Sequence, residues 1–215
     1  MKQISYCIVS ILIVFCFTSS SQSSNRYKET VNKVMSKFDC NEEDAKNFMG
    51  YVQGKVRRVQ NNFTKIASDF TERIDKYDLI EFTIDEYFES PNSLIYTTSL
   101  NSSNVDSMSV KYYLTRLANK YWGRYDKVEL YFHPNYLSLG TIHKYNRKFG
   151  NIYEFHVETI QIFKGYLGEN IIYSDATIKV FGFVFSKNIK KNEWELKVRA
   201  ITAKPPIELK ESDWQ

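Results

Sequence analysis

The stretch NIYEFHVETIQIF, residues 151 to 163, places His156 between Glu154 and Glu158 at a spacing of two residues. On a β-strand these three side chains, here called the Glu-His-Glu row, project from one face. Imidazole and carboxylate groups bind zinc and carry protons in acid–base catalysis. A zinc site also needs an enclosed geometry and partners behind its ligands, so the row alone does not establish one.

The residues that alternate with the Glu-His-Glu row indicate which face the row occupies. They are aromatic or aliphatic: Tyr153, Phe155, Val157 and Phe163. Because the apolar side chains of an antiparallel sheet pack inward, we predict that the row lies on the outer surface and binds no metal. The pattern leaves open whether that surface faces water or a second subunit.

Other motifs of enzymes and metal sites are absent from the sequence. The chain has no Gly-rich phosphate loop, no paired-Cys spacing, no Gly-x-Ser-x-Gly and no His-Glu-x-x-His. We therefore predict no cofactor. The formal net charge of the 215 residues is only +4, with both signs mixed along the chain, which argues against nucleic acid as a partner.

The first residues have the pattern of a secretory signal. Lys2 is the only charge before Arg26, residues 4 to 17 are nearly all apolar, and the small-residue run TSSSQSS follows. The apolar run is shorter than the about 20 residues that a membrane span needs. We predict an exported protein, periplasmic or secreted, that is cleaved between Ser19 and Ser24 and has no transmembrane span afterwards.

The cysteines give a rival interpretation of the same segment. Cys16 could instead carry a lipid anchor, but lipoprotein signals have a small residue just before the cysteine, where this chain has Phe15. In either case Cys7 leaves with the signal and Cys40 has no partner for an internal disulfide. The exported chain must then be held together by its hydrophobic core.

The first half of the mature chain is predicted to be helical. Apolar residues at steps of three and four form a stripe from Ala45 to Phe70, which indicates one long amphipathic helix with Asn41 as its N-cap. Thr83 and Glu86 fit a capping box that would open a short helix over 83–90. After a strand at 93–99, the polar run 101–107 is predicted to turn the chain into a helix that ends near Gly123.

The second half is predicted to form strands. Five segments rich in aromatic and β-branched residues follow Gly123 and are separated by short polar turns. Such short connections between long strands favour antiparallel neighbours in a meander. Pro205 and Pro206 end the pattern, and we expect a loose tail beyond them.

This order of elements resembles the nuclear transport factor 2-like superfamily, whose members have a cone-shaped α+β fold. The segments that carry the resemblance are TIDEYFESPNSLIYTTS (83 to 99), VKYYLTRLANKY (110 to 121) and the three long strands between 151 and 203. The resemblance implies N-terminal helices packed on a strongly curved antiparallel sheet. It also implies a cone whose wide mouth can hold an apolar ligand, and in many members a homodimer through the outer sheet face.

The resemblance suggests where a ligand would lie in this chain. A pocket is usually apolar with a few placed polar groups, and tyrosine supplies both. The pocket candidates come from four predicted elements: Tyr87, Tyr96, Tyr113, Tyr153 and Phe155. His133 and Tyr136 are candidates for the mouth of the cone. The alternative is that the tyrosines fill the core and their hydroxyls reach its edge.

Three functions follow from this interpretation. The first is an exported non-enzymatic domain that binds a small apolar ligand or a protein partner. The second is an isomerase- or dehydratase-like enzyme, which in this superfamily has an Asp or His base and a Tyr donor inside the cone; no such set matches this chain by motif. An ionisable residue deep in the cone with a perturbed pKa would favour the enzyme. The third is a cell-envelope protein that interacts through its N-terminal helix.

The predicted division of the chain follows the same elements. Residues 1–24 are the signal peptide and 25–67 a helical extension. Residues 68–203 form the α+β domain, and 204–215 are the tail.

Overall fold

The computed structural model describes residues 28–69, 71–100, 102–132, 138–147, 150–188 and 193–208. The predicted signal peptide, its Cys16, and the mouth candidates His133 and Tyr136 lie outside these residues. The chain divides into two compact units between Gly50 and Tyr51, a point that lies within one long helix. The predicted boundary at residues 67 and 68 falls at the end of that helix and stays a prediction.

The described part of the first unit, residues 28–50, is helical. Residues 28–38 form a helix, and α2 (Glu42–Ala67) begins after a turn in which Asp39 has a φ of 53°. Asn41 caps α2 as predicted, because its Oδ1 accepts a hydrogen bond from Asp44 N at 2.9 Å. The rings of Phe38 and Phe48 pack at 4.6 Å between centroids and tie the two helices together.

The second unit starts with the C-terminal part of α2 and contains α3 (Arg73–Tyr87), α4 (Val110–Ala118) and α5 (Lys120–Gly123). The predicted stripe is confirmed here, since its side chains are buried: Val52, Val56, Val59, Phe63 and Ile66. Two polar contacts attach this part of α2 to the sheet. Gln60 Nε2 donates to Thr159 Oγ1 at 2.9 Å, and Thr64 Oγ1 donates to the carbonyl of Leu130 at 3.0 Å.

The predicted capping box at Thr83 is wrong. Thr83 lies inside α3, where its hydroxyl donates to the carbonyl of Leu79 at 2.5 Å. Asn62 of α2 in turn donates to this hydroxyl at 3.0 Å. The hydroxyl is therefore satisfied inside the helix by a bond to the preceding turn, and a Thr three residues before a Glu does not here mark a helix start.

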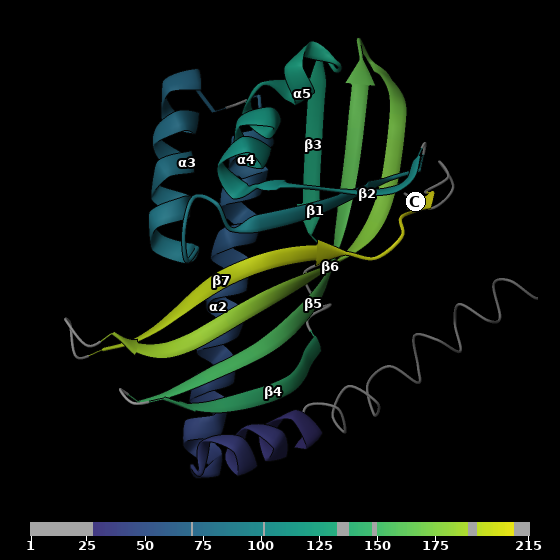
Figure 1. Ribbon diagram of the computed structural model, residues 1–215. Helices are drawn as coiled ribbons and strands as arrows, with labels where there is room; N and C mark the ends of the chain where they lie inside the picture. The colour runs from purple at the N-terminus through teal and green to yellow at the C-terminus, as the bar shows by residue number, and fades with distance from the viewer. Residues whose placement is uncertain are drawn as a thin grey trace, which may run out of the picture. The chain divides into compact units, whose positions relative to one another are not determined.

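The strands form one sheet in the order β2-β1-β7-β6-β5-β3, with β4 also paired to β5 and β8 to β6. Their bounds are β1 Leu94–Ser99, β2 Ser102–Ser109, β3 Lys127–Phe132, β4 Ser138–Arg147, β5 Gly150–Leu167, β6 Asn170–Asn188, β7 Glu193–Ala203 and β8 Ile207–Glu208. The predicted antiparallel meander is present from β4 to β7. The α+β fold class, with helices on a strongly curved and mainly antiparallel sheet, is confirmed (Figure 1).

Three details of the sheet differ from the sequence prediction. Residues 102–107 of the polar run do not form a turn into the helix but make up most of β2, which forms a hairpin with β1. The strand β1 pairs in parallel with β7, so the sheet is mixed. Finally, β8 lies in the stretch that was expected to be a loose tail and pairs with β6. In each case the edge of a neighbouring strand supplies backbone partners that local propensity does not reveal.

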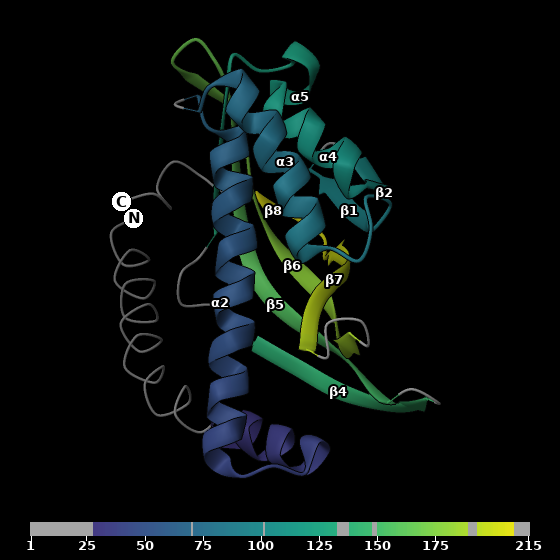
Figure 2. The same ribbon diagram turned by 90° about the vertical axis from the view of Figure 1, so that its left-hand side faces the viewer.

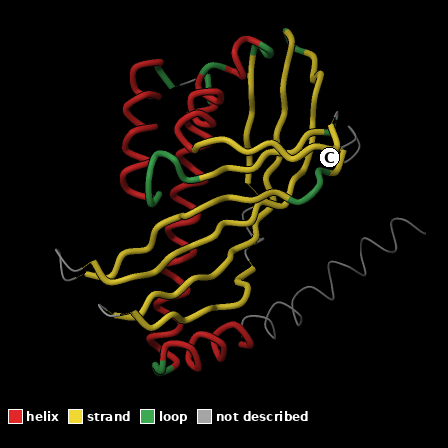
Figure 3. The backbone as a smooth tube through the Cα atoms, in the orientation of Figure 1, coloured by secondary structure: helices red, strands yellow, loops and turns green. Residues whose placement is uncertain are grey.

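The two longest strands give the sheet its curvature. Along one edge, β5 pairs first with β4 and then, from Gln161 onward, with β3. Its other edge pairs with β6 over nearly the whole length of both strands. The backbone trace shows both strands bending between these two halves (Figure 3). Seen from the side, α3 and α4 lie beside the half of the sheet that includes β1 and β2 (Figure 2).

Candidate functional site

The Glu-His-Glu row lies on the outer face of the sheet, as predicted. His156 is exposed, while Glu154 forms an ion pair with Arg199 at 2.5 Å and Glu158 one with Lys204 at 2.8 Å. No group of three His, Cys, Asp or Glu side chains that could hold a metal ion occurs among the described residues. The two carboxylates of the row therefore form ion pairs with Arg199 of β7 and with Lys204, which follows β7.

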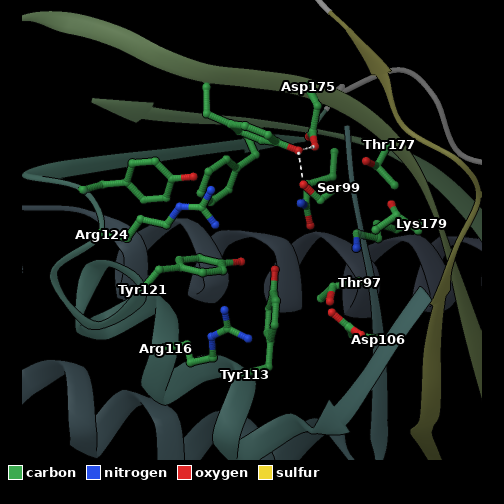
Figure 4. A pocket seen from close by; sticks show the side chains of 15 residues that line it. Thr97, Ser99, Asp106, Tyr113, Arg116, Tyr121, Arg124, Asp175, Thr177 and Lys179 are labelled. Atoms are coloured by element: carbon green, nitrogen blue, oxygen red, sulfur yellow. Dashed lines mark hydrogen bonds between the residues drawn. The ribbon is translucent and has the colours of Figure 1, made fainter. Parts of the chain in front are cut away.

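A cavity of about 150 Å³ opens on the other face of the sheet. Its lining comes from β1, β2, α4, α5 and the residues that follow α5, and from the first half of β6 with the facing part of β5. Unlike the expected apolar pocket, it is lined largely by polar and charged side chains. Those labelled in Figure 4 are Thr97, Ser99, Asp106, Tyr113, Arg116, Tyr121, Arg124, Asp175, Thr177 and Lys179.

The floor of the cavity is a row of alternate residues on β6. Tyr173, Asp175, Thr177 and Lys179 share one face of the strand because they are spaced by two. Their cross-strand neighbours on β5 are Gly165, Phe163, Gln161 and Thr159. The same face of β6 becomes aromatic from Phe181 onward, so the polar row is continuous with the core.

Asp175 is the buried acid of this row. Its residue is only 4% exposed, and Tyr173 donates its hydroxyl to Asp175 Oδ2 at 2.5 Å. Burial raises the pKa of Asp175, while the Tyr173 hydrogen bond and the positive charge of Lys179 act in the opposite direction. No described Lys or Arg reaches ion-pair distance of its carboxylate.

Lys179 is the buried base of the row and is also 4% exposed. Its Nζ donates to the backbone carbonyl of Tyr96 on β1 at 3.2 Å. Burial lowers the pKa of the Lys179 ammonium from 10.5 to about 8, against the opposing effect of Asp175. The cavity therefore contains a carboxyl and an amine that burial shifts towards their neutral forms.

Two tyrosines stand opposite the β6 row. Tyr113 of α4 and Tyr121 of α5 are joined by a hydrogen bond between their hydroxyls, and burial raises the pKa of both phenols. Tyr121 and the preceding Lys120 have φ values of 57° and 49°, in the left-handed region that non-glycine residues rarely occupy. Such strain persists only where packing imposes it, and it often marks functional sites.

The packing that imposes this conformation centres on Phe163. The rings of Tyr121, Tyr125 and Tyr173 contact Phe163 edge-on, at centroid distances of 5.3, 5.8 and 5.9 Å. Gly165, two residues along β5, makes room for the ring of Tyr125: a Cβ at position 165 would stand 2.4 Å from Tyr125 Cε1. The aromatic cluster thus fixes one wall of the cavity.

Two arginines complete the lining. The guanidinium of Arg116 lies over the ring of Tyr121 at 4.8 Å, and that of Arg124 over Tyr125 at 5.5 Å. Arg116 Nη1 contacts Met108 Sδ at 3.8 Å, and a thioether is a weak acceptor. Its Nε is buried and has no hydrogen-bond partner among the described residues.

The sequence candidates separate into two groups. Tyr113 lines the cavity, and Tyr96 contributes its backbone carbonyl to Lys179. The other three are buried elsewhere in the second unit and do not line the cavity. Tyr87 lies under Lys55, with 4.9 Å from Nζ to the ring centroid. Tyr153 packs on Trp194 and Phe155 on Phe183, at centroid distances of 6.1 and 5.6 Å.

The most deeply buried charged residues of the cavity, Asp175 and Lys179, were not predicted from the sequence. A signal for them exists in the alternation of β6. If the inward positions Phe181 and Phe183 are extended backwards by twos, they meet Lys179, Thr177 and Asp175. Charged residues on an otherwise apolar face are unusual enough to mark a site.

Comparisons with known proteins give likenesses of structure only. No family model matches the chain, and no curated protein matches it. Similar solved structures include the Kfla4162 protein from Kribbella flavida, at 8% identity and a TM-score of 0.38, covering 72% of this chain and 91% of that one. A Streptomyces avermitilis protein assigned to the NTF2-like family as a dehydratase has 12% identity and a TM-score of 0.32, covering 73% and 96%.

A third similar structure is a Shewanella frigidimarina NCIMB 400 protein assigned as a ketosteroid isomerase, with 11% identity and a TM-score of 0.30, covering 61% of this chain and 91% of that one. No helix in the described part of the chain has the length and apolar character of a membrane span.

Proposed function

We propose that the cavity is an acid–base site that acts on a small polar substrate, in the manner of an isomerase or a dehydratase. The observation that carries this proposal is Asp175, a carboxyl that is 4% exposed, lines a cavity and has a raised pKa. A buried ionisable residue with a perturbed pKa favours an enzyme over a binding domain. A general base works best when its pKa lies near the working pH.

The other side chains fit supporting roles. Asp175 would take a proton from carbon or oxygen of the substrate. Tyr113 and Tyr121 keep their protons because burial raises their pKa, so they can donate hydrogen bonds to an oxygen that gains negative charge. Tyr173 holds the Asp175 carboxyl in place through its 2.5 Å hydrogen bond.

The alternative is an exported, non-enzymatic domain that binds a small ligand. The cationic side chains with unused donors favour this second function, because they can hold a ligand without any proton transfer. The polar lining supports a polar ligand in place of the apolar one expected from the resemblance. Export through the N-terminal signal, with or without a lipid on Cys16, and a homodimer through the outer sheet face belong to either proposal.

The third function, interaction through the N-terminal helix, needs a test adapted to the two units. The C-terminal part of α2 supplies buried residues of the second unit, including Val56 and Phe63. A deletion that tests a partner-binding role should therefore end at Gly50, where the first unit ends, and should leave the second unit folded.

The acid–base proposal is tested by proton exchange. A panel of small carbonyl compounds in D₂O, including acetone, pyruvate, acetoacetate and dihydroxyacetone, is incubated with the protein, and loss of the C–H signals is followed by NMR. We expect exchange of at least one compound to be faster with the wild type than with Asp175→Asn by about 100-fold or more. The control Glu158→Gln, on the outer face, should match the wild type. Equal exchange in Asp175→Asn, or none in the wild type, would contradict the proposal.

A further inference from the structure

We infer that the ligand of this cavity is a small carboxylic acid, and that Arg116 and Lys179 bind its carboxylate. This inference rests on the proposed function only in taking the cavity as the ligand site. It specifies the class of molecule that binds there.

The charges that line the cavity do not balance. The cavity is lined by the cations Arg116, Arg124 and Lys179 and by the carboxylates of Asp106 and Asp175. Within the described parts of the chain, none of the three cations has a carboxylate within 4.0 Å. The cavity thus has more cations than carboxylates, and no described carboxylate forms an ion pair with any of the three cations.

Lys179 and Arg116 have more hydrogen-bond donors than the described residues have acceptors for them. An ammonium has three donors, and the one hydrogen bond of Lys179 to a described residue goes to the Tyr96 carbonyl. A guanidinium has five donors, and Arg116 has a weak sulfur acceptor for Nη1 and no described acceptor for its buried Nε. Buried donors without acceptors are rare in native proteins, so their presence in a cavity indicates a missing acceptor.

Arg116 and Lys179 line the same cavity. The Arg116 guanidinium carbon lies 4.8 Å from the centre of the Tyr121 ring, and this cation–π contact holds the guanidinium at the cavity. A guanidinium is planar and can bind a carboxylate with two parallel hydrogen bonds. In the close view, Arg116 and Lys179 lie on either side of the Tyr113 side chain, and both point into the cavity (Figure 4). The volume of about 150 Å³ limits the ligand to a few carbon atoms.

The position of Asp175 then sets the orientation of the ligand. Asp175 is four residues from Lys179 on the same face of β6, a separation of about 13 Å between Cα atoms in an extended strand. A carboxylate bound near Lys179 leaves the rest of a short acid directed towards Asp175 and away from its like charge. The acid group of the substrate and its reacting carbon would thus have separate places in one cavity.

The test measures binding of sodium pyruvate and sodium propionate to the purified chain by NMR titration at constant ionic strength. Acetone serves as the neutral analogue and inorganic phosphate as the other oxyanion. We expect both carboxylates to bind and acetone not to bind. Arg116→Gln and Lys179→Met should each weaken carboxylate binding about tenfold or more, while Arg199→Gln on the outer face should leave it unchanged.

The outcomes separate this inference from the acid–base proposal. If neither carboxylate binds, if neither variant weakens binding, or if only phosphate binds, the inference is wrong. Should Lys179→Met fail to fold, Arg116→Gln decides the matter together with Arg199→Gln, since only the former should lose binding. Carboxylate binding without proton exchange would leave the inference standing and contradict the proposed function. Proton exchange of neutral compounds without carboxylate binding would support the proposed function and contradict the inference about the ligand.

Discussion

Tyr173 donates its hydroxyl to Asp175 at 2.5 Å from two residues away on the same face of β6. The same phenol oxygen accepts a hydrogen bond from the backbone N–H of Leu100 at 3.2 Å and lies 3.5 Å from Ser99 Oγ. Tyr173 therefore connects the end of β1 to the buried acid and restricts the orientation of its carboxylate.

Removing this hydroxyl should raise the pKa of Asp175. The Tyr173 hydrogen bond stabilises the ionised carboxylate and lowers its pKa against the effect of burial, so Tyr173→Phe removes the largest opposing contribution. The pKa is measured from the carboxyl ¹³C shift of Asp175 as a function of pH. An unchanged or lower pKa in Tyr173→Phe would show that the hydroxyl does not donate to the carboxylate in solution.

A second tyrosine–carboxylate pair in the sheet provides the control. Tyr166 donates to Glu129 Oε2 at 2.7 Å, and this hydrogen bond contributes to the lowered pKa of Glu129. Tyr166→Phe should raise the pKa of Glu129 and leave that of Asp175 unchanged.

Asp175→Asn should stabilise the fold at neutral pH. The pKa of Asp175 is 3.8 in the unfolded chain and higher in the folded chain. At a pH between these two pKa values the folded state binds more protons than the unfolded state, so stability falls as pH rises through this window. The variant lacks this loss, so its Tm should exceed that of the wild type at pH 7, and the difference should shrink towards pH 4. Thermal unfolding followed by circular dichroism measures both. The exposed Asp106→Asn should change stability by less than about 0.5 kcal/mol.

Lys179→Met should also stabilise the fold at pH 7, by up to about 3 kcal/mol, which corresponds to the decrease in the pKa of Lys179 from 10.5 to about 8. The unfolded chain keeps the Lys179 proton up to pH 10.5, whereas the folded chain keeps it only up to about pH 8. The wild type therefore gains stability as pH rises from 8 to 10.5, and the stability difference between Lys179→Met and the wild type disappears. Urea denaturation between pH 7 and 10.5 measures it. A gain that does not depend on pH would point to packing instead.

The control for Lys179→Met is Lys111→Met, which removes a cation from the surface. Lys111 is exposed and pairs with the equally exposed Glu81 at 2.8 Å. Its loss should change stability by less than about 1 kcal/mol, without the dependence on pH expected at Lys179.

Gly165→Ala should destabilise the second unit by about 1 to 3 kcal/mol, because the added Cβ would stand 2.4 Å from the ring of Tyr125 and force the aromatic wall to move. Gly54 offers a matched control in α2, where an added Cβ meets nothing within 4 Å. Gly54→Ala should stabilise the helix by about 1 kcal/mol. Urea denaturation of the two variants tests the pair, and equal effects would contradict the close contact at Gly165.

The elements with strong periodicity were predictable from the sequence. The local pattern predicts the apolar stripe of α2, its Asn41 cap and the alternation of β5, and these elements led to the correct fold class. The position of the Glu-His-Glu row was predictable for the same reason. The row alternates with Tyr153, Phe155 and Val157, and because these apolar side chains are buried, the row must lie on the opposite face.

The site was less predictable because it depends on contacts between distant segments. Asp175 and Tyr121 are 54 residues apart, and only the pairing of β5 with β6 and the turn after α4 bring them to one cavity. The hairpin partner of β1 and its parallel pairing with β7 are likewise set by neighbours and not by propensity. The tyrosine candidates were chosen by residue type, and only Tyr113 has its side chain in the cavity lining.

The inward face of β6 also has a consequence for how this protein can change over time. Its cavity residues, from Tyr173 to Lys179, and its core residues, from Phe181 onward, occupy successive stretches of one strand. Substitutions in the first stretch can alter the chemistry of the cavity while the second continues to hold the sheet together. A lineage that carries this fold can therefore acquire a new ligand by changing a few alternate positions, without having to rebuild its core.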